Sequence, residues 1–326
     1  MDHGAFKKEI EVTLGLIQRA ALATETIRQR GIEAVDKEDG SPLTQADIVS
    51  QAIILQGLRE RFPEDRIVAE EEVQLGEAEV LREAACQVLQ EMGFTESEEK
   101  LLEWVNYRGN PRGSRLWMID PIDGTKGFKK GLCYAIAIGL YYDGRPRFGC
   151  MGAPLFPDDE KGATSTRIAC AAAGVGAYGY DSKQDRLRRI HVSDVDKISR
   201  LRLIGSRAHD RGDLCRKFTE KAGVGQFSRM DGQAKYLMLA TGQADVHLRA
   251  VDPVFGIGYP WDHCAGQVIL EEAGGVATGF DGRPLNYDQL PGSPIKDLDG
   301  LVASNALCHE TILELVREIA SSQDDP

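Results

Sequence analysis

Apolar residues near the start of the chain follow a helical period. Between residues 10 and 21 they recur every three or four positions, which predicts an amphipathic helix that ends at Gly31. The same spacing returns from about residue 46 to residue 61, and Pro63 then breaks the pattern. A polar turn at residues 39–42 separates the two stretches. The first sixty residues are therefore expected to form two helices joined by a turn.

Two short apolar runs end in carboxylates. Residues 66–69 lead into Glu70, and residues 116–119 lead into Asp120. Both runs are typical of buried strands, here strands that deliver an acidic side chain. The stretch between them, residues 77–105, is acidic and helix-prone, and its cluster from Glu96 to Glu99 is expected to form a solvated face or a helix cap.

Two longer apolar runs, at residues 132–142 and 145–151, flank Asp143-Gly144, and this arrangement predicts a β-hairpin. Residues 174–179 match the pattern G-x-G-x-x-G. A dinucleotide site would need an apolar helix after that pattern, but a polar, turn-like segment follows instead. A hairpin turn is therefore expected there.

Strand and helix patterns alternate in the second half of the chain. Strands are expected at residues 167–172, 188–192, 201–204, 244–248 and 300–303. Helices are expected at residues 210–222, 233–241, 262–273 and 306–320. The fold class is therefore α/β, with an α+β half followed by an α/β half. Pro, Asp, Gly and Thr cluster at residues 157–164, so we expect one domain over residues 1–160 and another over residues 161–326.

Composition and charge narrow the possible partners. The formal net charge is −12 and the basic residues form no tract, which argues against a nucleic-acid polymer as partner. A small anionic substrate remains possible if bound cations reverse the local charge. The longest apolar run is shorter than a membrane span, and the seven cysteines show no C-x-x-C pair. Free thiols in a reducing compartment, the cytoplasm, are the simplest interpretation.

The run Asp120-Pro121-Ile122-Asp123-Gly124-Thr125 is the strongest chemical signal. Pro121 disturbs the strand and Gly124 permits a tight turn. Such a bend can direct both carboxylates and the Ile122 carbonyl toward one point, and oxygen ligands of this kind suit Mg²⁺. An Asp-Gly turn alone would be commonplace, but the whole run after an apolar strand points to a metal site.

Three other segments bring acidic groups that also have simpler explanations. Glu70 could belong to a solvated acidic loop, Asp262 could be the N-cap of the helix at residues 262–273, and Thr44 and Asp47 could cap the helix at residues 46–61. Glu70 and Asp262, together with Asp120, Asp123 and the Ile122 carbonyl, would suffice for a two-cation phosphatase centre. Asp47 and Thr125 would fit the role of orienting the attacking water.

Six segments, in order, resemble the 3′(2′),5′-bisphosphate nucleotidase branch of the lithium-sensitive, magnesium-dependent phosphatase superfamily that includes inositol monophosphatase. The segments are residues 41–47, 62–71, 117–128, 233–236, 244–249 and 261–266. Lys126-Gly127-Phe128, at the end of the central motif, favours the nucleotidase branch. The resemblance implies a layered αβαβα sandwich like that of inositol monophosphatase and fructose-1,6-bisphosphatase.

The resemblance also implies roles for particular residues. It implies two or three Mg²⁺ ions per site, held by Glu70, Asp120, the Ile122 carbonyl, Asp123 and Asp262. It implies that Asp47 and Thr125 position the water. It implies further that the substrate is contacted by Thr125, Ser206, Gly232, Lys235, Arg249 and Asp262. The implied reaction removes the 3′-phosphate of adenosine 3′,5′-bisphosphate, and that of its 5′-phosphosulfate analogue, with inhibition by Li⁺.

Two departures from the family pattern leave the substrate open. Ser206 stands where a nucleoside-contacting His is common, and Gly232 stands where Ser is common. Inositol polyphosphate 1-phosphatase or inositol monophosphatase activity is therefore an alternative. A non-catalytic anion sensor would be expected to lack the metal ligands, which are all present. The partner is a small phosphorylated nucleotide, with no nucleic-acid polymer and no membrane, and the chain is a monomer or a homodimer.

Overall fold

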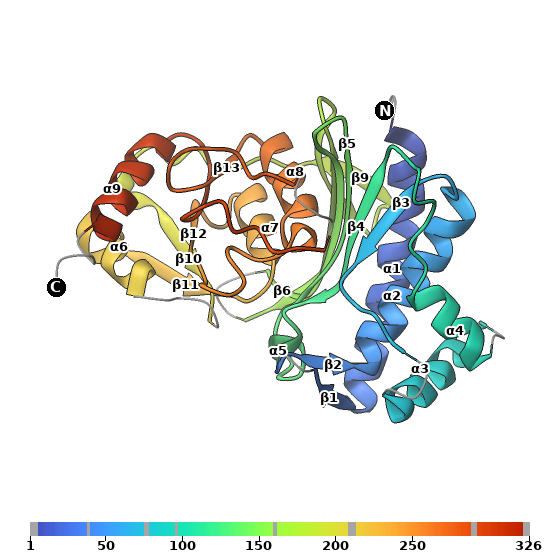
Figure 1. Cartoon of the computed structure of the whole chain (residues 1–326). Coiled ribbons are helices and arrows are strands. Elements are labelled where there is room, and N and C mark those ends of the chain that lie inside the picture. The colour runs from blue at the N-terminus through green and yellow to red at the C-terminus, as the bar shows by residue number, and fades with distance from the viewer. Residues whose placement is uncertain are drawn as a thin grey trace.

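Helices and β-sheets form five alternating layers through the molecule, in the order helix, sheet, helix, sheet, helix (Figure 1). This computed structural model describes residues 6–37, 40–74, 78–94, 97–158, 162–207, 213–287 and 292–321. The layering confirms the αβαβα sandwich that the family resemblance implies. It also places the junction between the two sheets near the middle of the molecule, where the site described below lies.

Two long helices form the first layer. They are α1 (Lys7–Arg30) and α2 (Gln45–Arg61), with the small hairpin of β1 (Ala34–Asp36) and β2 (Pro42–Thr44) between them. Both helices lie where the sequence predicts them. Helix α1 buries one face, as its apolar period indicates, whereas α2 is buried on almost every side against its helical neighbours and the sheet. The acidic segment forms α3 (Glu79–Glu91) and α4 (Glu98–Val105), which pack on α2.

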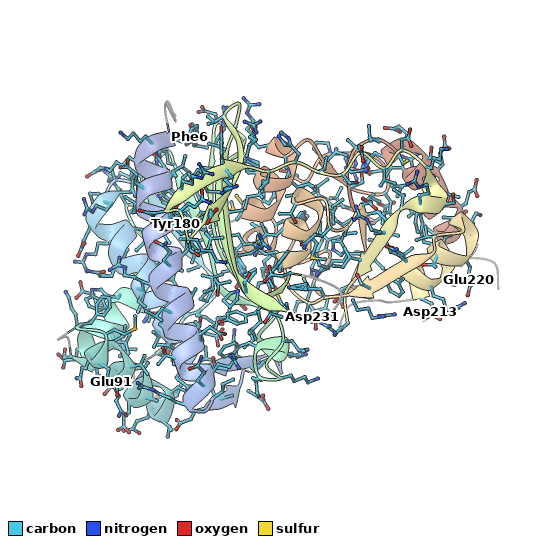
Figure 2. The ribbon with its side chains drawn as sticks, turned by 180° about the vertical axis from the view of Figure 1, so that it is seen from behind. Phe6, Glu91, Tyr180, Asp213, Glu220 and Asp231 are labelled. Carbon is cyan, nitrogen blue, oxygen red and sulfur yellow. The ribbon has the colours of Figure 1, made fainter. Side chains whose placement is uncertain are left out.

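A seven-stranded sheet forms the second layer, and its strands lie in the order of the sequence. They are β3 (Arg66–Ala69), β4 (Leu116–Asp123), β5 (Ala135–Tyr142), β6 (Arg145–Pro157), β7 (Thr164–Ala172), β8 (Gly176–Asp181) and β9 (Arg186–Arg189). Only β3 and β4 run parallel; the other neighbours are antiparallel. Tyr180 of β8 lies beside the first half of α1 (Figure 2).

Both turn predictions for this sheet are confirmed. Asp143 and Gly144 connect β5 to β6 with φ values of 52° and 73°, the left-handed pair that a two-residue hairpin needs. The G-x-G-x-x-G stretch forms the turn from β7 to β8 and the start of β8, and no helix follows it among the described residues.

The remaining layers come from the second half of the chain. Helices α7 (Ala234–Ala240) and α8 (Cys264–Glu272) form the middle layer, and α6 (Leu214–Ala222) and α9 (His309–Ser321) form the outer one. Between them lies a five-stranded sheet in the order β11-β10-β12-β14-β13. Its strands are β10 (Arg202–Gly205), β11 (Gln226–Arg229), β12 (Val246–Ala250), β13 (Val276–Thr278) and β14 (Gly300–Ser304).

The sequence pattern missed five short strands: β1, β2, β8, β11 and β13. Each has three to six residues, and β11 is exposed along its whole length, so no apolar alternation marks it. The seven-stranded sheet continues through three strands after residue 160. The division into residues 1–160 and 161–326 therefore stays a prediction about folding units.

The cysteines are free thiols, and six of the seven are buried, as the sequence predicts. In the described ranges, no helix combines the length and apolar character needed to cross a membrane.

Candidate active site

Strand β4 carries the central motif into the interior. The strand is buried along nearly its whole length, and its register with β5 shifts between Asp120 and Asp123. Two side chains fix this irregular segment: the Ser50 hydroxyl donates to the Pro121 carbonyl at 2.8 Å, and the Thr125 hydroxyl donates to the Ile122 carbonyl at 3.0 Å. The bulge thereby turns both carboxylates toward the middle layer.

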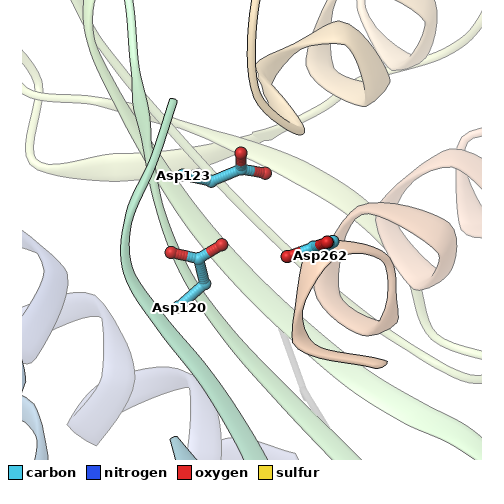
Figure 3. Close-up of side chains that lie close together, drawn as sticks. All are labelled: Asp120, Asp123 and Asp262. Carbon is cyan, nitrogen blue, oxygen red and sulfur yellow. The ribbon is translucent and has the colours of Figure 1, made fainter. Parts of the chain in front are cut away.

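Three carboxylates meet at this point. Asp120, Asp123 and Asp262 each place an oxygen within 4.8 Å of the other two (Figure 3). Asp262 comes from the short 3₁₀ helix η4 (Pro260–Asp262), far from β4 in the sequence. Asp120 is buried, and its Oδ1 has no hydrogen-bond partner. An acidic cluster with an unsatisfied oxygen fits a hard cation such as Mg²⁺ or another divalent ion.

The interpretation of Asp262 as the N-cap of an apolar helix was wrong. Helix α8 begins at Cys264, and its N-cap is His263. The Asp262 carboxylate instead accepts the backbone N–H of Tyr259 at 2.9 Å, within the 3₁₀ turn that precedes the helix. This turn carries the carboxylate away from the helix end and toward β4.

Desolvation and mutual repulsion act on the whole cluster. Removal from water raises the pKa of Asp262 to about 8, and the charge of Asp123 adds to the effect. The same two causes, with Glu70 as the leading charge, hold the pKa of Asp120 well above its usual range. The three groups therefore cannot all be ionised near neutral pH unless a cation lies between them.

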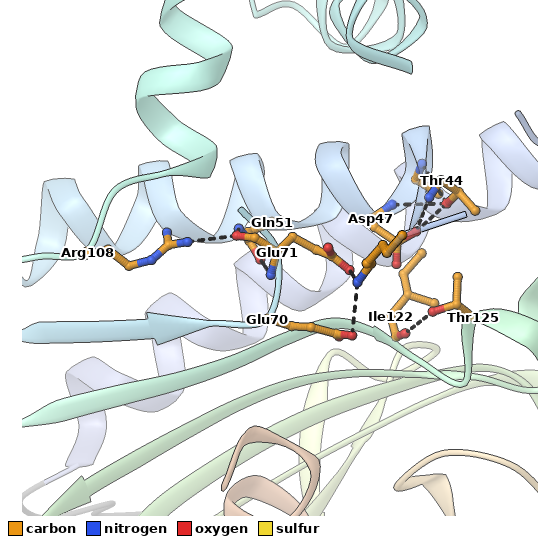
Figure 4. A network of polar contacts seen from close by, with 10 residues as sticks. Thr44, Asp47, Gln51, Glu70, Glu71, Arg108, Ile122 and Thr125 are labelled. Carbon is orange, nitrogen blue, oxygen red and sulfur yellow. Dashed lines mark hydrogen bonds and ion pairs between the residues drawn. The ribbon is translucent and has the colours of Figure 1, made fainter. Parts of the chain in front are cut away.

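Glu70 lies beside this cluster rather than within the three-residue group. It follows β3, and a side-chain hydrogen bond links its carboxyl to that of Asp120. Lys37 places its Nζ 3.5 Å from Glu70 Oε1 and 2.6 Å from Glu71 Oε1. Figure 4 shows these two carboxylates in the same network as Asp47 and Thr44. Desolvation and the charge of Glu71 raise the pKa of Glu70 to about 7. Lys37 was missed by the sequence analysis, because no spacing ties it to Glu70.

Thr44 and Asp47 form the capping box predicted for the start of α2. The Thr44 side chain accepts the backbone N–H of Asp47, and Asp47 Oδ2 accepts the Thr44 backbone N–H at 2.8 Å and its hydroxyl at 2.5 Å. Asp47 is fully buried and its Oδ1 has no partner. Desolvation raises its pKa to about 7. No hydrogen bond between Asp47 and Thr125 occurs among the described contacts.

A cavity of about 280 Å³ opens above the carboxylates. The lining of this cavity includes all six residues that were expected to contact the substrate: Thr125, Ser206, Gly232, Lys235, Arg249 and Asp262. Glu70 and Asp123 line it too, whereas Asp47, Asp120 and Ile122 are not among its lining residues. The fold thus brings together, in one cavity, residues from β4, α7, β12 and η4, from the loop before α7 and from the segment that follows β3.

Lys235 and Arg249 place positive charge in this cavity. Lys235 is buried, and its Nζ donates to the Gly232 carbonyl at 2.5 Å. Desolvation lowers the pKa of Lys235 to about 8, although the nearby Asp123 opposes the shift. Carboxylates and cations therefore share one small volume, which suits a substrate that carries more than one anionic group.

The loop that contains Gly232 approaches β4 closely. Gly232 has a φ of 70°, and a Cβ there would lie 2.6 Å from the Asp123 carbonyl oxygen. The next residue, Gln233, donates its backbone N–H to Asp123 Oδ2 at 2.6 Å. Ser206 donates its hydroxyl to Asp231 Oδ1 at 3.2 Å at the other end of the loop. His209, at the start of the helix expected at residues 210–222 and more simply a surface residue than a substrate contact, lies outside the described residues.

Sequence reasoning missed several residues that line the cavity. They include His247, Asp252, Phe255 and Tyr259. His247 lies within a segment that resembles the nucleotidase branch, so its position beside Arg249 was a usable signal. The other three lie in a loop whose sequence carries no chemical pattern.

Known proteins share both the sequence and the fold. The inositol monophosphatase family model matches residues 7–321. A 3′(2′),5′-bisphosphate nucleotidase from Schizosaccharomyces pombe is 30% identical, over 97% of this chain and 97% of its own length. The corresponding protein from Dictyostelium discoideum is also 30% identical, over 94% of this chain and 96% of its own.

Solved structures agree on the fold. An IMPase from Thermotoga maritima superposes with a TM-score of 0.67 at 21% identity, covering 96% of this chain and 98% of the other. An inositol monophosphatase from Anabaena superposes with a TM-score of 0.63, again at 21% identity, covering 96% of each chain. With the family match over nearly the whole length, the chain belongs to the inositol monophosphatase family.

Proposed function

We propose that this chain is a Mg²⁺-dependent phosphatase that removes the 3′-phosphate of adenosine 3′,5′-bisphosphate, giving AMP and inorganic phosphate. One observation carries the proposal: three carboxylates converge at a cavity, two of them line it, and the same cavity holds Lys235 and Arg249. The relatives that are about 30% identical over nearly the full chain are named bisphosphate nucleotidases, which supports the same substrate class.

The cation site would use the acidic groups that line the cavity or lie beside it. Two or three Mg²⁺ ions would be held by Glu70, Asp120, the Ile122 carbonyl, Asp123 and Asp262. Bound Mg²⁺ supplies charge neutralisation of the phosphoryl oxygens and a water of lowered pKa. The unsatisfied Asp120 Oδ1 and the raised pKa values of the cluster support this assignment.

The protein's own groups would handle the proton and the orientation of the substrate. Asp47 takes the proton of the attacking water through its free Oδ1, and its pKa near 7 suits a general base at neutral pH. Thr125, anchored on the Ile122 carbonyl, places its hydroxyl oxygen beside that water. Lys235 and Arg249 bind the second phosphate, and Ser206 and Gly232 border the nucleoside.

The same site would accept the 5′-phosphosulfate analogue, and Li⁺ would inhibit by occupying a Mg²⁺ position. We further propose a cytoplasmic protein, a monomer or a homodimer, without nucleic-acid polymer or membrane partners. The seven free thiols and the net charge of −12 support this location and these exclusions.

Phosphate release from adenosine 3′,5′-bisphosphate and from inositol phosphates, measured side by side with Mg²⁺, tests the substrate. A higher kcat/KM for the nucleotide is expected, together with inhibition by LiCl. Inositol phosphates are the comparison because Ser206 and Gly232 depart from the common nucleotidase pattern. Preference for an inositol phosphate would overturn the nucleotide assignment while leaving the metal-dependent hydrolysis in place.

A further inference from the structure

Gln233 connects the two segments that carry Asp123 and Asp262. Its backbone N–H donates to Asp123 Oδ2 at 2.6 Å, and its side-chain Nε2 donates to the Trp261 carbonyl at 3.0 Å. Trp261 immediately precedes Asp262 in η4. One residue thus spans the gap between β4 of the seven-stranded sheet and the turn before α8.

The connection is short and buried. Gln233 is 2% exposed, so both hydrogen bonds are shielded from water. Gly232 has a positive φ and no side chain. The backbone can come this close to Asp123 because no Cβ is present to meet the Asp123 carbonyl oxygen. Gln233 is also the N-cap residue of α7, whose Lys235 lines the same cavity.

The two carboxylates need such a connection because their charges oppose each other. Oxygens of Asp123 and Asp262 lie within 4.8 Å of each other, and like charges at this distance repel. Gln233 contacts Asp123 through its backbone N–H, while its side-chain amide holds the segment that carries Asp262 nearby.

The side-chain amide of Gln233 has an oxygen, Oε1, that takes no part in the bond to Trp261. The Trp261 carbonyl can only accept, so the NH₂ group of Gln233 faces it, and Oε1 is the other end of the amide. Oε1 is buried without a hydrogen-bond partner. Buried acceptors are normally satisfied, so this oxygen is available to a donor that enters the site.

We propose that Gln233 is a positioning residue that sets the spacing of Asp123 and Asp262 and thereby the affinity of the site for a divalent cation. The inference rests on the proposed cation site, but not on the identity of the substrate. A purely structural glutamine would change the stability of the fold without a selective effect on cation binding.

The test is cation binding by the purified full-length chain, measured by calorimetry with Mg²⁺ and by electron paramagnetic resonance with Mn²⁺. Gln233→Met keeps the length of the side chain and the backbone N–H to Asp123 but removes the donor to Trp261. We expect at least a tenfold rise in the Kd for Mn²⁺. Gln233→Asn, which keeps an amide but shortens its reach, should give a smaller rise.

Gln267→Met is the matched control. Gln267 is also a buried glutamine, and it bonds Glu271 and Tyr287 in α8 and the loop beyond it. This variant should lose stability and keep the wild-type Kd for Mn²⁺. Wild-type Mn²⁺ affinity in folded Gln233→Met, or in Gln233→Asn if the Met variant does not fold, would overturn the inference.

The two proposals fail in different ways. A wild-type chain that binds Mn²⁺ but releases no phosphate from nucleotides or inositol phosphates would refute the proposed function and leave the role of Gln233 open to the binding test. A wild-type chain that binds neither cation would overturn the role of Gln233, whatever its activity.

Discussion

Asp47 combines a fixed and an open carboxylate oxygen. Its Oδ2 is held by two donors of Thr44, whereas Oδ1 is buried and has no partner. This division orients the carboxylate without consuming the oxygen that would accept a proton. Because Asp47 is not among the three clustered carboxylates, its effect on chemistry should separate from cation binding.

Asp47→Asn is expected to lower kcat by about 10²–10⁴-fold, the usual contribution of a general base. The amide keeps an acceptor for Thr44, so the fold and the Mg²⁺ affinity should stay close to wild type. Steady-state phosphate release and calorimetric Mg²⁺ titration of the same preparation check both parts. Turnover near the wild-type rate would remove Asp47 from the mechanism.

Gly232 has a conformation and a neighbour that exclude a side chain. Its φ of 70° favours glycine, and a Cβ would lie 2.6 Å from the Asp123 carbonyl oxygen. Gly232→Ala is therefore expected to cost about 1–3 kcal/mol of unfolding free energy and to weaken Mg²⁺ binding by displacing Asp123. Urea unfolding and Mg²⁺ titration measure the two effects. Gly223→Ala, at a similar φ of 65° but with open space around its Cβ, isolates the cost of the backbone conformation.

At the scale of elements, the start of α2 serves both stability and the site. The Thr44 hydroxyl caps the helix and donates to Asp47 Oδ2 at 2.5 Å. A single side chain therefore stabilises the helix end and fixes the orientation of the neighbouring carboxylate.

Thr44→Ala should lower the unfolding free energy by about 1 kcal/mol, the usual cost of losing an N-cap. It should also lower kcat, because Asp47 loses one of its two fixed hydrogen bonds. Thr44→Ser keeps the hydroxyl and is the control, with both properties expected near wild type. Denaturant unfolding of the two variants measures the unfolding free energy, and steady-state kinetics measure kcat. Equal kcat values in the two variants would separate the cap from catalysis.

Elements with a strong apolar period were predictable from the sequence, and elements defined by pairing were not. Helix α1 follows the period of its apolar face, and β4 follows its continuous apolar run. Helix α2 was predicted in the right place, although it is buried on almost every side and not on one face alone. Strand β11 has four exposed residues and exists because it pairs with β10, which no local pattern encodes.

The site divides in the same way. Asp120 and Asp123 share one local motif, so their common role was readable from the sequence. Gln233 and Lys37 act on carboxylates that lie 110 and 33 residues away, and only the folded chain brings these pairs together.

At the scale of the whole molecule, the buried carboxylates make stability depend on cations and pH. Carboxyl groups in an unfolded chain have pKa values of about 4, whereas the pKa of Asp262 in the folded chain is about 8. The folded state without cations therefore binds more protons than the unfolded state between these values. Its stability must fall as pH rises through this window.

The Tm of the cation-free protein is expected to fall by several degrees between pH 6.5 and 8 in EDTA. Saturating Mg²⁺ should raise the Tm and weaken this trend, because bound cations favour the ionised carboxylates. Two other buried groups make stability rise with pH, but they act outside this range. The pKa of His263 is lowered to about 3, so its effect ends near the unfolded value of 6.5. The pKa of Lys235 is lowered to about 8, so its effect begins only there. Thermal melts followed by circular dichroism provide the measurement. A Tm in EDTA that rises over this range would contradict the expectation.

The arginines of β9 govern how the seven-stranded sheet meets other molecules. β9 is the last strand of that sheet, and three of its four residues are arginines on a largely exposed edge. If a second copy added its own β9 there, six guanidinium groups would crowd one two-stranded ribbon. Like charges opposite each other on neighbouring strands repel, so this edge discourages the strand addition that leads to fibrils or runaway aggregates. A homodimer that formed through a different face of the protein would avoid this repulsion.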